Sequence, residues 1–220
     1  MSRPPAQSRE ISGRHSRGRA KATTHGELSL IALDLFIERG FDRTTVDDVA
    51  SAAGIGRRTL FRYFPSKNDL LWGDFDLQLE AMRARLAGTS REVPLIETLR
   101  AAVVEFNRFP ESERPRHHSR MQMLSRIPSL QAHSTLRYAD WRRVIAEHVA
   151  SRRGEDPDDL TPQTMAWACL GLCLGAYDQW LAGTDLDLPE LIDQAFATAE
   201  TVFGSFTAEH RVDTEGKAAG

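Results

Sequence analysis

Apolar residues recur at helical spacing along almost the whole chain, and no segment alternates convincingly between apolar and polar residues as a strand would. Leu28, Ile31 and Leu35, for example, fall on one face of a helix. Proline and glycine interrupt this pattern at intervals. The sequence therefore predicts an all-α fold of nine helices, at about 24–39, 45–53, 57–64, 66–86, 95–109, 112–126, 129–152, 162–182 and 188–206.

Polar residues mark where several of these helices begin. Thr24 with Glu27, and Ser66 with Asp69, have the spacing of a capping box, in which two side chains satisfy the free N–H groups of the first turn. Thr45 is placed to cap the second helix. We therefore expect a long helix to follow Ser66 without a break.

Charge is spread unevenly along the 220 residues. Residues 1–72 hold 12 Lys and Arg against 8 Asp and Glu, whereas the whole chain has a net charge of −3. Any contact with nucleic acid is therefore expected in the N-terminal part, residues 1–72. The segments predicted are a disordered basic arm at 1–22, a three-helix unit at 23–68, a larger helical domain at 69–206 and a disordered tail at 207–220. The arm either reaches a minor groove of DNA or only aids solubility.

Several classes of protein are disfavoured. Cys169 and Cys173 are the only cysteines and lie on an apolar helix, so small core residues are expected rather than a disulfide framework or a metal pair. The most apolar run, at 166–177, is shorter than the roughly 20 residues of a membrane span. His117 and His118 are adjacent and rarely share one ion. We expect a cytoplasmic protein with no catalytic residues, metal or cofactor.

Gly54-Ile55-Gly56 separates two short helical patterns, as in a helix-turn-helix. Ile55, Leu60 and Phe64 are expected to face inward, which leaves a basic and aromatic set outward. Arginine can pair with guanine or phosphate, but a basic helix face is also commonly just solvated, so spacing alone leaves both readings open. The outward set is Arg57, Arg58, Thr59, Phe61, Arg62 and Tyr63.

The two kinds of DNA contact are expected to fall on different residues. Arg57, Arg58 and Thr59 are assigned mainly to base edges, which specify sequence. The DNA backbone is assigned to Thr45, Tyr63 and Lys67, the last because it precedes a predicted helix N-terminus.

The segment "TTVDDVASAAGIGRRTLFRYFPSKNDLL" resembles the helix-turn-helix of TetR-family transcriptional regulators. This resemblance implies that 23–68 is a DNA-binding domain and 69–206 a ligand-binding and dimerisation domain. It also implies a homodimer on double-stranded operator DNA, with repression as the default. Two positions depart from the family pattern: Phe61 stands where tyrosine is common, and Gly56 where a capping serine is common. The family's DNA contacts carry over to Thr45, Arg57, Arg58, Thr59, Phe61, Tyr63 and Lys67.

Three further segments, "RYFPSKNDLLWGDFDLQLEAMRARL", "LRAAVVEFNRFP" and "PSLQAHSTLRYADWRRVIAEHVA", resemble the TetR-type regulators associated with mycofactocin biosynthesis. The resemblance implies control of mycofactocin-related genes and release from DNA by a small apolar effector such as a long-chain acyl-CoA. The other function that the residues allow is a helical small-molecule carrier without DNA binding.

The back half carries the expected sites for pairing and for a ligand. Residues 162–182 are apolar nearly all round, so this helix and 188–206 are expected to pack against a second subunit. The basic cluster at 114–120 either attracts ligand phosphates or, as the residues favour, is a solvated junction. For any one aromatic or Met in the middle helices, plain core packing is the competing explanation. The expected ligand-binding residues are Phe106, Phe109, Met123, Leu124, Tyr138, Trp141 and Trp167.

Overall fold

The computed structural model describes residues 24–183 and 187–217, with the backbone alone for 203–217. Every regular element in these ranges is helical, which confirms the predicted all-α fold with nine α-helices. The predicted basic arm at 1–22 lies outside the described residues. The helices are α1 (His25–Arg39), α2 (Val46–Ala52), α3 (Arg57–Tyr63), α4 (Phe75–Gly88), α5 (Leu95–Phe106), α6 (Arg114–Arg126), α7 (Pro128–Arg153), α8 (Leu160–Leu181) and α9 (Leu188–Lys217), with short 3₁₀ helices η1 (Asn68–Leu71) and η2 (Glu111–Glu113).

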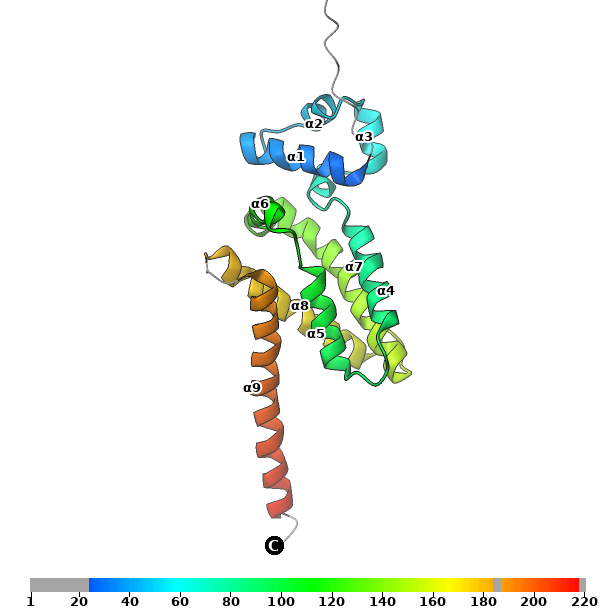
Figure 1. The fold of residues 1–220 in the computed structure, drawn as a ribbon, viewed down its shortest axis with the longest axis vertical. Coiled ribbons are helices and arrows are strands. Elements are labelled where there is room, and N and C mark those ends of the chain that lie inside the picture. The colour runs from blue at the N-terminus through cyan, green and yellow to red at the C-terminus, as the bar shows by residue number, and fades with distance from the viewer. Residues whose placement is uncertain (1–23, 184–186, 218–220) are drawn as a thin grey trace, which may run out of the picture.

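Helices α1–α3 form a small unit at one end of the molecule (Figure 1). Thr24 and Glu27 make the predicted capping box at the start of α1. Thr45 caps α2 through a second box, because its hydroxyl accepts from the Asp48 N–H while the Asp48 carboxylate accepts from the Thr45 N–H at 2.8 Å. Gly54 turns the chain between α2 and α3 with a φ of 70°, a conformation that glycine adopts without strain.

The segment that joins this unit to α4 differs from the prediction. A continuous helix after Ser66 is wrong, because the chain forms only η1 and then breaks at Gly73, where φ is 51°. The Asp69 carboxylate accepts from the Ser66 N–H at 2.9 Å, which is one half of the predicted box. A side chain at position 73 would meet the Ser29 hydroxyl at 2.9 Å, so the chain bends where α1 comes closest.

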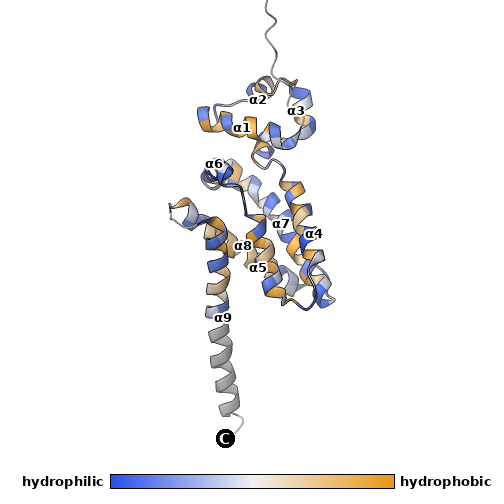
Figure 2. Cartoon of the chain, viewed as in Figure 1, coloured by the Kyte–Doolittle hydropathy of each residue, from blue (hydrophilic) through white to orange (hydrophobic). Residues whose placement is uncertain are grey.

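Helices α4–α9 form the second unit, in which α7 packs against α4, α6 and α8 while α9 packs against α5 and α8. Their buried apolar side chains are continuous with those of α1–α3. Helix α6 belongs to the second unit and also packs against α1 of the first. Figure 2 shows that α6 is mostly hydrophilic, so we expect polar contacts as well as apolar packing between α6 and α1.

The last helix is longer than predicted. The backbone of α9 runs to Lys217, past the predicted end at 206, while the disordered tail at 207–220 stays a prediction and 218–220 lie outside the described residues. No proline follows Pro189, so nothing in the sequence forces the helix to stop. Figure 1 shows α9 running well past the ends of the neighbouring helices.

Candidate DNA-binding surface and ligand cavity

Helix α3 is held in place by its inner face. Leu60 is 1% exposed and Phe64 is 3% exposed, and Ile55 packs half-buried against the same core, as the sequence predicted. Gly56 caps the helix without a side-chain hydrogen bond. Helix α3 is therefore anchored by apolar packing, and the side chains on its outer face are not needed for this packing.

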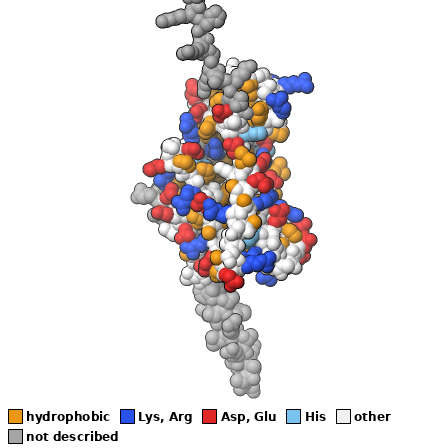
Figure 3. Space-filling model, turned by 45° about the vertical axis from the view of Figure 1, so that its right-hand side comes forward, with side chains coloured by type: hydrophobic (Ala, Val, Ile, Leu, Met, Phe, Trp, Pro, Cys, Tyr) orange, Lys and Arg blue, Asp and Glu red, His pale blue; other side chains and the backbone are white. Residues whose placement is uncertain are grey.

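The outer face of α3 is basic and aromatic. Arg57, Arg58 and Arg62 are exposed, Phe61 is 37% exposed, and Thr59 and Tyr63 are half-buried. Figure 3 shows Lys and Arg side chains projecting from this end of the molecule. The structure thus brings the outward set of the sequence analysis together on one short helix, at a spacing suited to base edges and phosphates.

Arg57 has an internal partner that the sequence did not reveal. Its Nη1 lies 2.8 Å from Oδ2 of Asp47 on α2, and its guanidinium lies 5.4 Å from the centre of the Phe61 ring. Both charged side chains are about 60% exposed, so the ion pair stabilises the fold by at most about 1 kcal/mol. Asp47 therefore competes with a base or a phosphate for Nη1 of Arg57.

Replacing Asp47 with Asn is therefore expected to strengthen DNA binding two- to five-fold at low salt, because Arg57 is released and a negative charge near the phosphates is removed. The gain should shrink as salt rises. Gel-shift titrations at two salt concentrations measure it. In an Arg57→Ala background the same change should give less than half of that gain, and an equal gain in both backgrounds would show that Asp47 does not act through Arg57.

The two expected backbone contacts outside α3 are engaged within the chain. The Thr45 hydroxyl is exposed but donates to Asp48 at 2.6 Å. The Lys67 ammonium donates to the Phe41 carbonyl oxygen and lies 4.1 Å from the centre of the Phe41 ring. Burial lowers the pKa of Lys67. Lys67 precedes only the four-residue η1, so the expected N-terminus of a long helix at this position is wrong.

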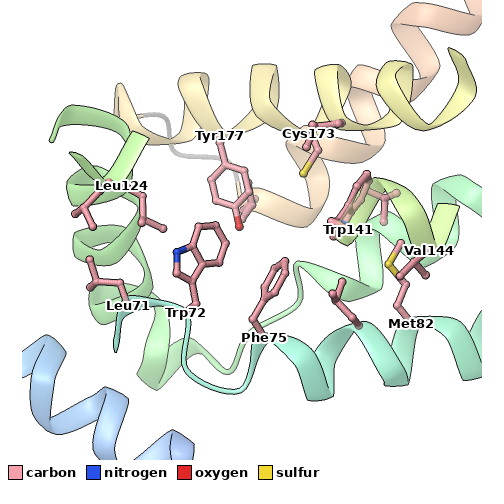
Figure 4. Packing of buried hydrophobic residues seen from close by; sticks show 14 of the residues in the cluster. Leu71, Trp72, Phe75, Met82, Leu124, Trp141, Val144, Cys173 and Tyr177 are labelled. Atoms are coloured by element: carbon pink, nitrogen blue, oxygen red, sulfur yellow. The ribbon is translucent and has the colours of Figure 1, made fainter. Parts of the chain in front are cut away.

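A small apolar cavity lies between α4, α5, α6, α7 and α8. Five of the seven predicted ligand-binding residues line it: Phe106, Phe109, Leu124, Tyr138 and Trp141. Its volume is about 70 Å³, which holds a few water molecules, whereas pockets for drug-sized ligands span roughly 300–1,000 Å³. A larger ligand must therefore displace side chains. Figure 4 shows labelled residues around this region, with Trp72 and Tyr177 pointing toward one another from different segments.

Two predicted ligand residues do not line the cavity. Trp167 is 56% exposed on α8, and the Arg142 guanidinium lies 3.3 Å from the centre of its ring. Met123 is half-buried on α6 but is not in the cavity wall. The resemblance and the residue types indicate a pocket in this region, but they do not fix which face of a helix each side chain occupies, and these two lie on other faces.

Buried polar groups form a chain along one wall of the cavity. The Asn107 Nδ2 donates to the Val103 carbonyl at 2.8 Å, so its Oδ1 accepts from the Tyr177 hydroxyl at 2.8 Å. The Tyr177 oxygen in turn lies 2.8 Å from Nε2 of His117. Burial lowers the pKa of His117 to about 3, so the imidazole is neutral at physiological pH.

The basic cluster at 114–120 is divided by the structure. His117 and Arg120 line the cavity, so the expectation of a solvated junction is wrong for these two residues. Arg116 instead contacts Asp34 of α1, at 2.9 and 3.2 Å. The three-residue spacing of His117 and Arg120 places them on one helix face, and this was the sequence signal that could have identified them.

A second, outer groove of about 260 Å³ adjoins the cavity. The two share Asn107, Phe109 and His117, and the Phe109 ring stacks on His117 with 3.9 Å between their centres. Arg114 and Asp187 make the outer groove more polar than the cavity. The stacked Phe109 and His117 therefore lie where the apolar cavity meets the more polar groove.

The cavity wall is connected to the DNA-binding unit at two places. Helix α6, which supplies Arg120 and Leu124 to the cavity, reaches α1 through Arg116 and Asp34. On the opposite side, the buried Asp69 of η1 accepts from His133 of α7 at 2.9 Å. Helices α6 and α7, which line the cavity, are thus in direct side-chain contact with α1 and with η1.

The cysteines, the possible metal ligands and the apolar helices were each considered for a further role. Burial raises the pKa of Cys169 and Cys173 to about 12, so both remain thiols. In residues 24–183 and 187–217, His, Cys, Asp and Glu side chains nowhere gather in a group of three that could hold a metal ion. None of the helices in the described part of the chain has both the length and the apolar character that a bilayer crossing requires.

Sequence comparisons agree with this architecture. Residues 31–71 match the bacterial regulatory proteins of the tetR family, and residues 93–204 match the family described as the MftR C-terminal domain. The chain belongs to the TetR family. This TetR-family regulator is 46% identical, over 81% of its length and 90% of the relative's, to the proposed mycofactocin biosynthesis transcriptional regulator MftR of Mycobacterium tuberculosis. The predicted resemblance is confirmed.

Solved structures share the fold of this TetR-family regulator. SmeT, the repressor of the Stenotrophomonas maltophilia multidrug efflux pump SmeDEF, matches with a TM-score of 0.56 at 19% identity, over 82% of this chain and 90% of that one. FadR of Thermus thermophilus, a repressor in complex with lauroyl-CoA, matches with a TM-score of 0.51 at 24% identity, over 77% and 90%. Likenesses at these identities concern the fold of the regulator alone.

Proposed function

We propose that this TetR-family regulator is a homodimeric repressor of mycofactocin-related genes that leaves its operator DNA when a small apolar effector binds. The observation that carries DNA binding is the exposed outer face of α3, where Arg57, Arg58 and Arg62 project around a buried anchor. A packed helix needs no such set of outward arginines. The protein would act in the cytoplasm, without catalytic chemistry.

Two features support a dimer, which we propose forms through α8 and α9, and the first of them lies on α8. One face of α8 is exposed, and it combines Trp167 with Gly171 and Gly175, beside which there is open space. Small residues let two helices approach closely, and an exposed tryptophan is typical of an interface. Two recognition helices are also needed to read half-sites one turn of DNA apart, about 34–36 Å.

The effector is expected to be apolar because the cavity wall is mainly aromatic and aliphatic. We propose a long-chain acyl-CoA as the first candidate, the class to which the ligand of T. thermophilus FadR belongs. An acyl chain exceeds the 70 Å³ cavity, so binding must move side chains. If the moved conformation holds α3 less suitably for DNA, linkage requires ligand and DNA to weaken each other's binding equally.

The test is a gel shift with the DNA upstream of mycofactocin-related genes of the same genome. We expect a specific complex that dodecanoyl-CoA dissolves and that equal concentrations of free CoA leave intact. A specific DNA complex that dodecanoyl-CoA does not dissolve would support a DNA-binding regulator but reject acyl-CoA as its effector. Ligand binding without any specific DNA complex would instead favour the helical carrier.

A further inference from the structure

The cavity wall contains a single permanently charged side chain. Arg120 of α6 lines the cavity, and none of the other residues in that wall is Asp, Glu or Lys. His117 is there too, but its low pKa keeps it neutral. An arginine among aromatic and aliphatic side chains is an unusual choice, since a charge removed from water is costly unless it is paired.

Arg120 has no such pairing within the described part of the chain. No ion pair joins its guanidinium to a carboxylate there, and its buried Nε has no hydrogen-bond partner. Burial lowers its pKa, and the longer-range attraction of Tyr177, Glu113 and Asp74 opposes this shift. The half-buried guanidinium therefore lies at the cavity wall without a carboxylate partner among the described residues.

Two more buried polar atoms on this wall lack partners. One is Nε1 of Trp72, which can only donate. The other is Nδ1 of His117. Because the Tyr177 hydroxyl donates to Asn107, its oxygen must accept from Nε2–H of His117, which leaves Nδ1 as an acceptor. One cavity thus combines two unsatisfied donors and one unsatisfied acceptor in an otherwise apolar wall.

We propose that this cavity binds the negatively charged oxygen group of an otherwise apolar ligand, with Arg120 as its counter-charge and Trp72 Nε1 as a second donor. The anion satisfies the guanidinium and the indole, while the apolar part displaces aromatic and aliphatic side chains. His117 Nδ1 can accept from a hydroxyl on the same ligand. The regulatory consequence rests on the proposed function, but the binding site does not.

The group is either the carboxylate of a free acid or a phosphate of an acyl-CoA. Both present anionic oxygens that an arginine binds through charge-assisted hydrogen bonds. Calorimetric titrations of the full chain with octanoate, dodecanoate and phenylbutanoate, each kept below its aggregation limit, distinguish them when compared with the matching alcohols and with dodecanoyl-CoA.

The deciding variant is Arg120→Met, with Arg126→Met as the matched control because Arg126 is exposed on the same helix. We expect Arg120→Met to weaken binding of the anionic ligand at least ten-fold, to change binding of the alcohol less than three-fold, and to leave the ligand-free melting temperature equal or higher. Trp72→Phe should weaken anion binding more modestly. Arg126→Met should bind as the unaltered chain does.

The inference is overturned if Arg120→Met binds every anionic ligand within three-fold of the unaltered chain, or if each alcohol binds as tightly as its acid. Gel shifts separate this result from the fate of the proposed function. If dodecanoyl-CoA releases DNA equally from the unaltered chain and from Arg120→Met, the proposed function is supported and the anion site is rejected. If ligand binding depends on Arg120 but does not affect DNA binding, the anion site is supported and the effector mechanism is rejected.

Discussion

Replacing Arg57 and Arg58 together with alanine is expected to weaken specific operator binding at least 100-fold. Both side chains project from α3, and one bidentate contact to a base contributes about 1–3 kcal/mol of discrimination. A dimer loses two such pairs. Because both residues are exposed, the free energy of unfolding should change by less than about 0.5 kcal/mol for each. Gel shifts and denaturant titrations measure the two quantities.

The control is Arg39→Ala, which replaces an exposed arginine at the end of α1, outside the recognition helix, and removes one positive charge where the double variant removes two. It should alter DNA affinity only slightly. Salt dependence adds a second readout, since the double variant should show a shallower slope of affinity against salt. A double variant that still prefers the operator over unrelated DNA would remove α3 from sequence recognition.

If the chain dimerises through α8 as proposed, Gly175→Lys is expected to make it monomeric at micromolar concentration. Gly175 is exposed in the middle of α8, and no atom lies within 4 Å of a side chain added there. Within one subunit the change should be neutral or stabilising, because glycine in a helix costs about 1 kcal/mol relative to alanine. Any loss must therefore arise between subunits. Sedimentation velocity reports the mass, and operator binding should fall with it.

Gly88→Lys provides the control, because Gly88 is another exposed helical glycine with open space beside it, at the end of α4. It should remain a dimer and bind DNA normally. Gly171→Lys, one helical turn before Gly175, should also prevent dimerisation. If the Gly175 variant stays dimeric while retaining its fold, the proposed interface on α8 is wrong.

The fold could be predicted where local chemistry decides it. The boxes at Thr24 and Thr45 act within three residues, and both helices begin where the sequence indicates. The break at Gly73 could not, since it depends on Ser29, which donates to the Leu70 carbonyl at 2.7 Å from more than 40 positions away. The Ser66 signal was real but extended only over η1.

The candidate site divides in the same way. Outward residues of α3 follow from helical periodicity, whereas the Asp47 partner of Arg57 and the Phe41 partner of Lys67 belong to other elements. In the cavity, aromatic residues were found because their type favours burial. Arg120 was assigned with its cluster to a solvated junction because arginine is usually exposed. Its three-residue spacing from His117 indicates the shared helix face, and the packing of neighbouring helices turns that face into the cavity wall.

The small size of the cavity has a consequence for how measured affinities should be read. A roomy chamber could accept a ligand equally well in every conformation, and such a ligand would shift no equilibrium however tightly it bound. A chamber of 70 Å³ admits a larger molecule only after the side chains of its wall have moved. The apparent dissociation constant then includes the cost of expansion. A weak effector that strongly releases DNA is thus the behaviour to expect of this chain.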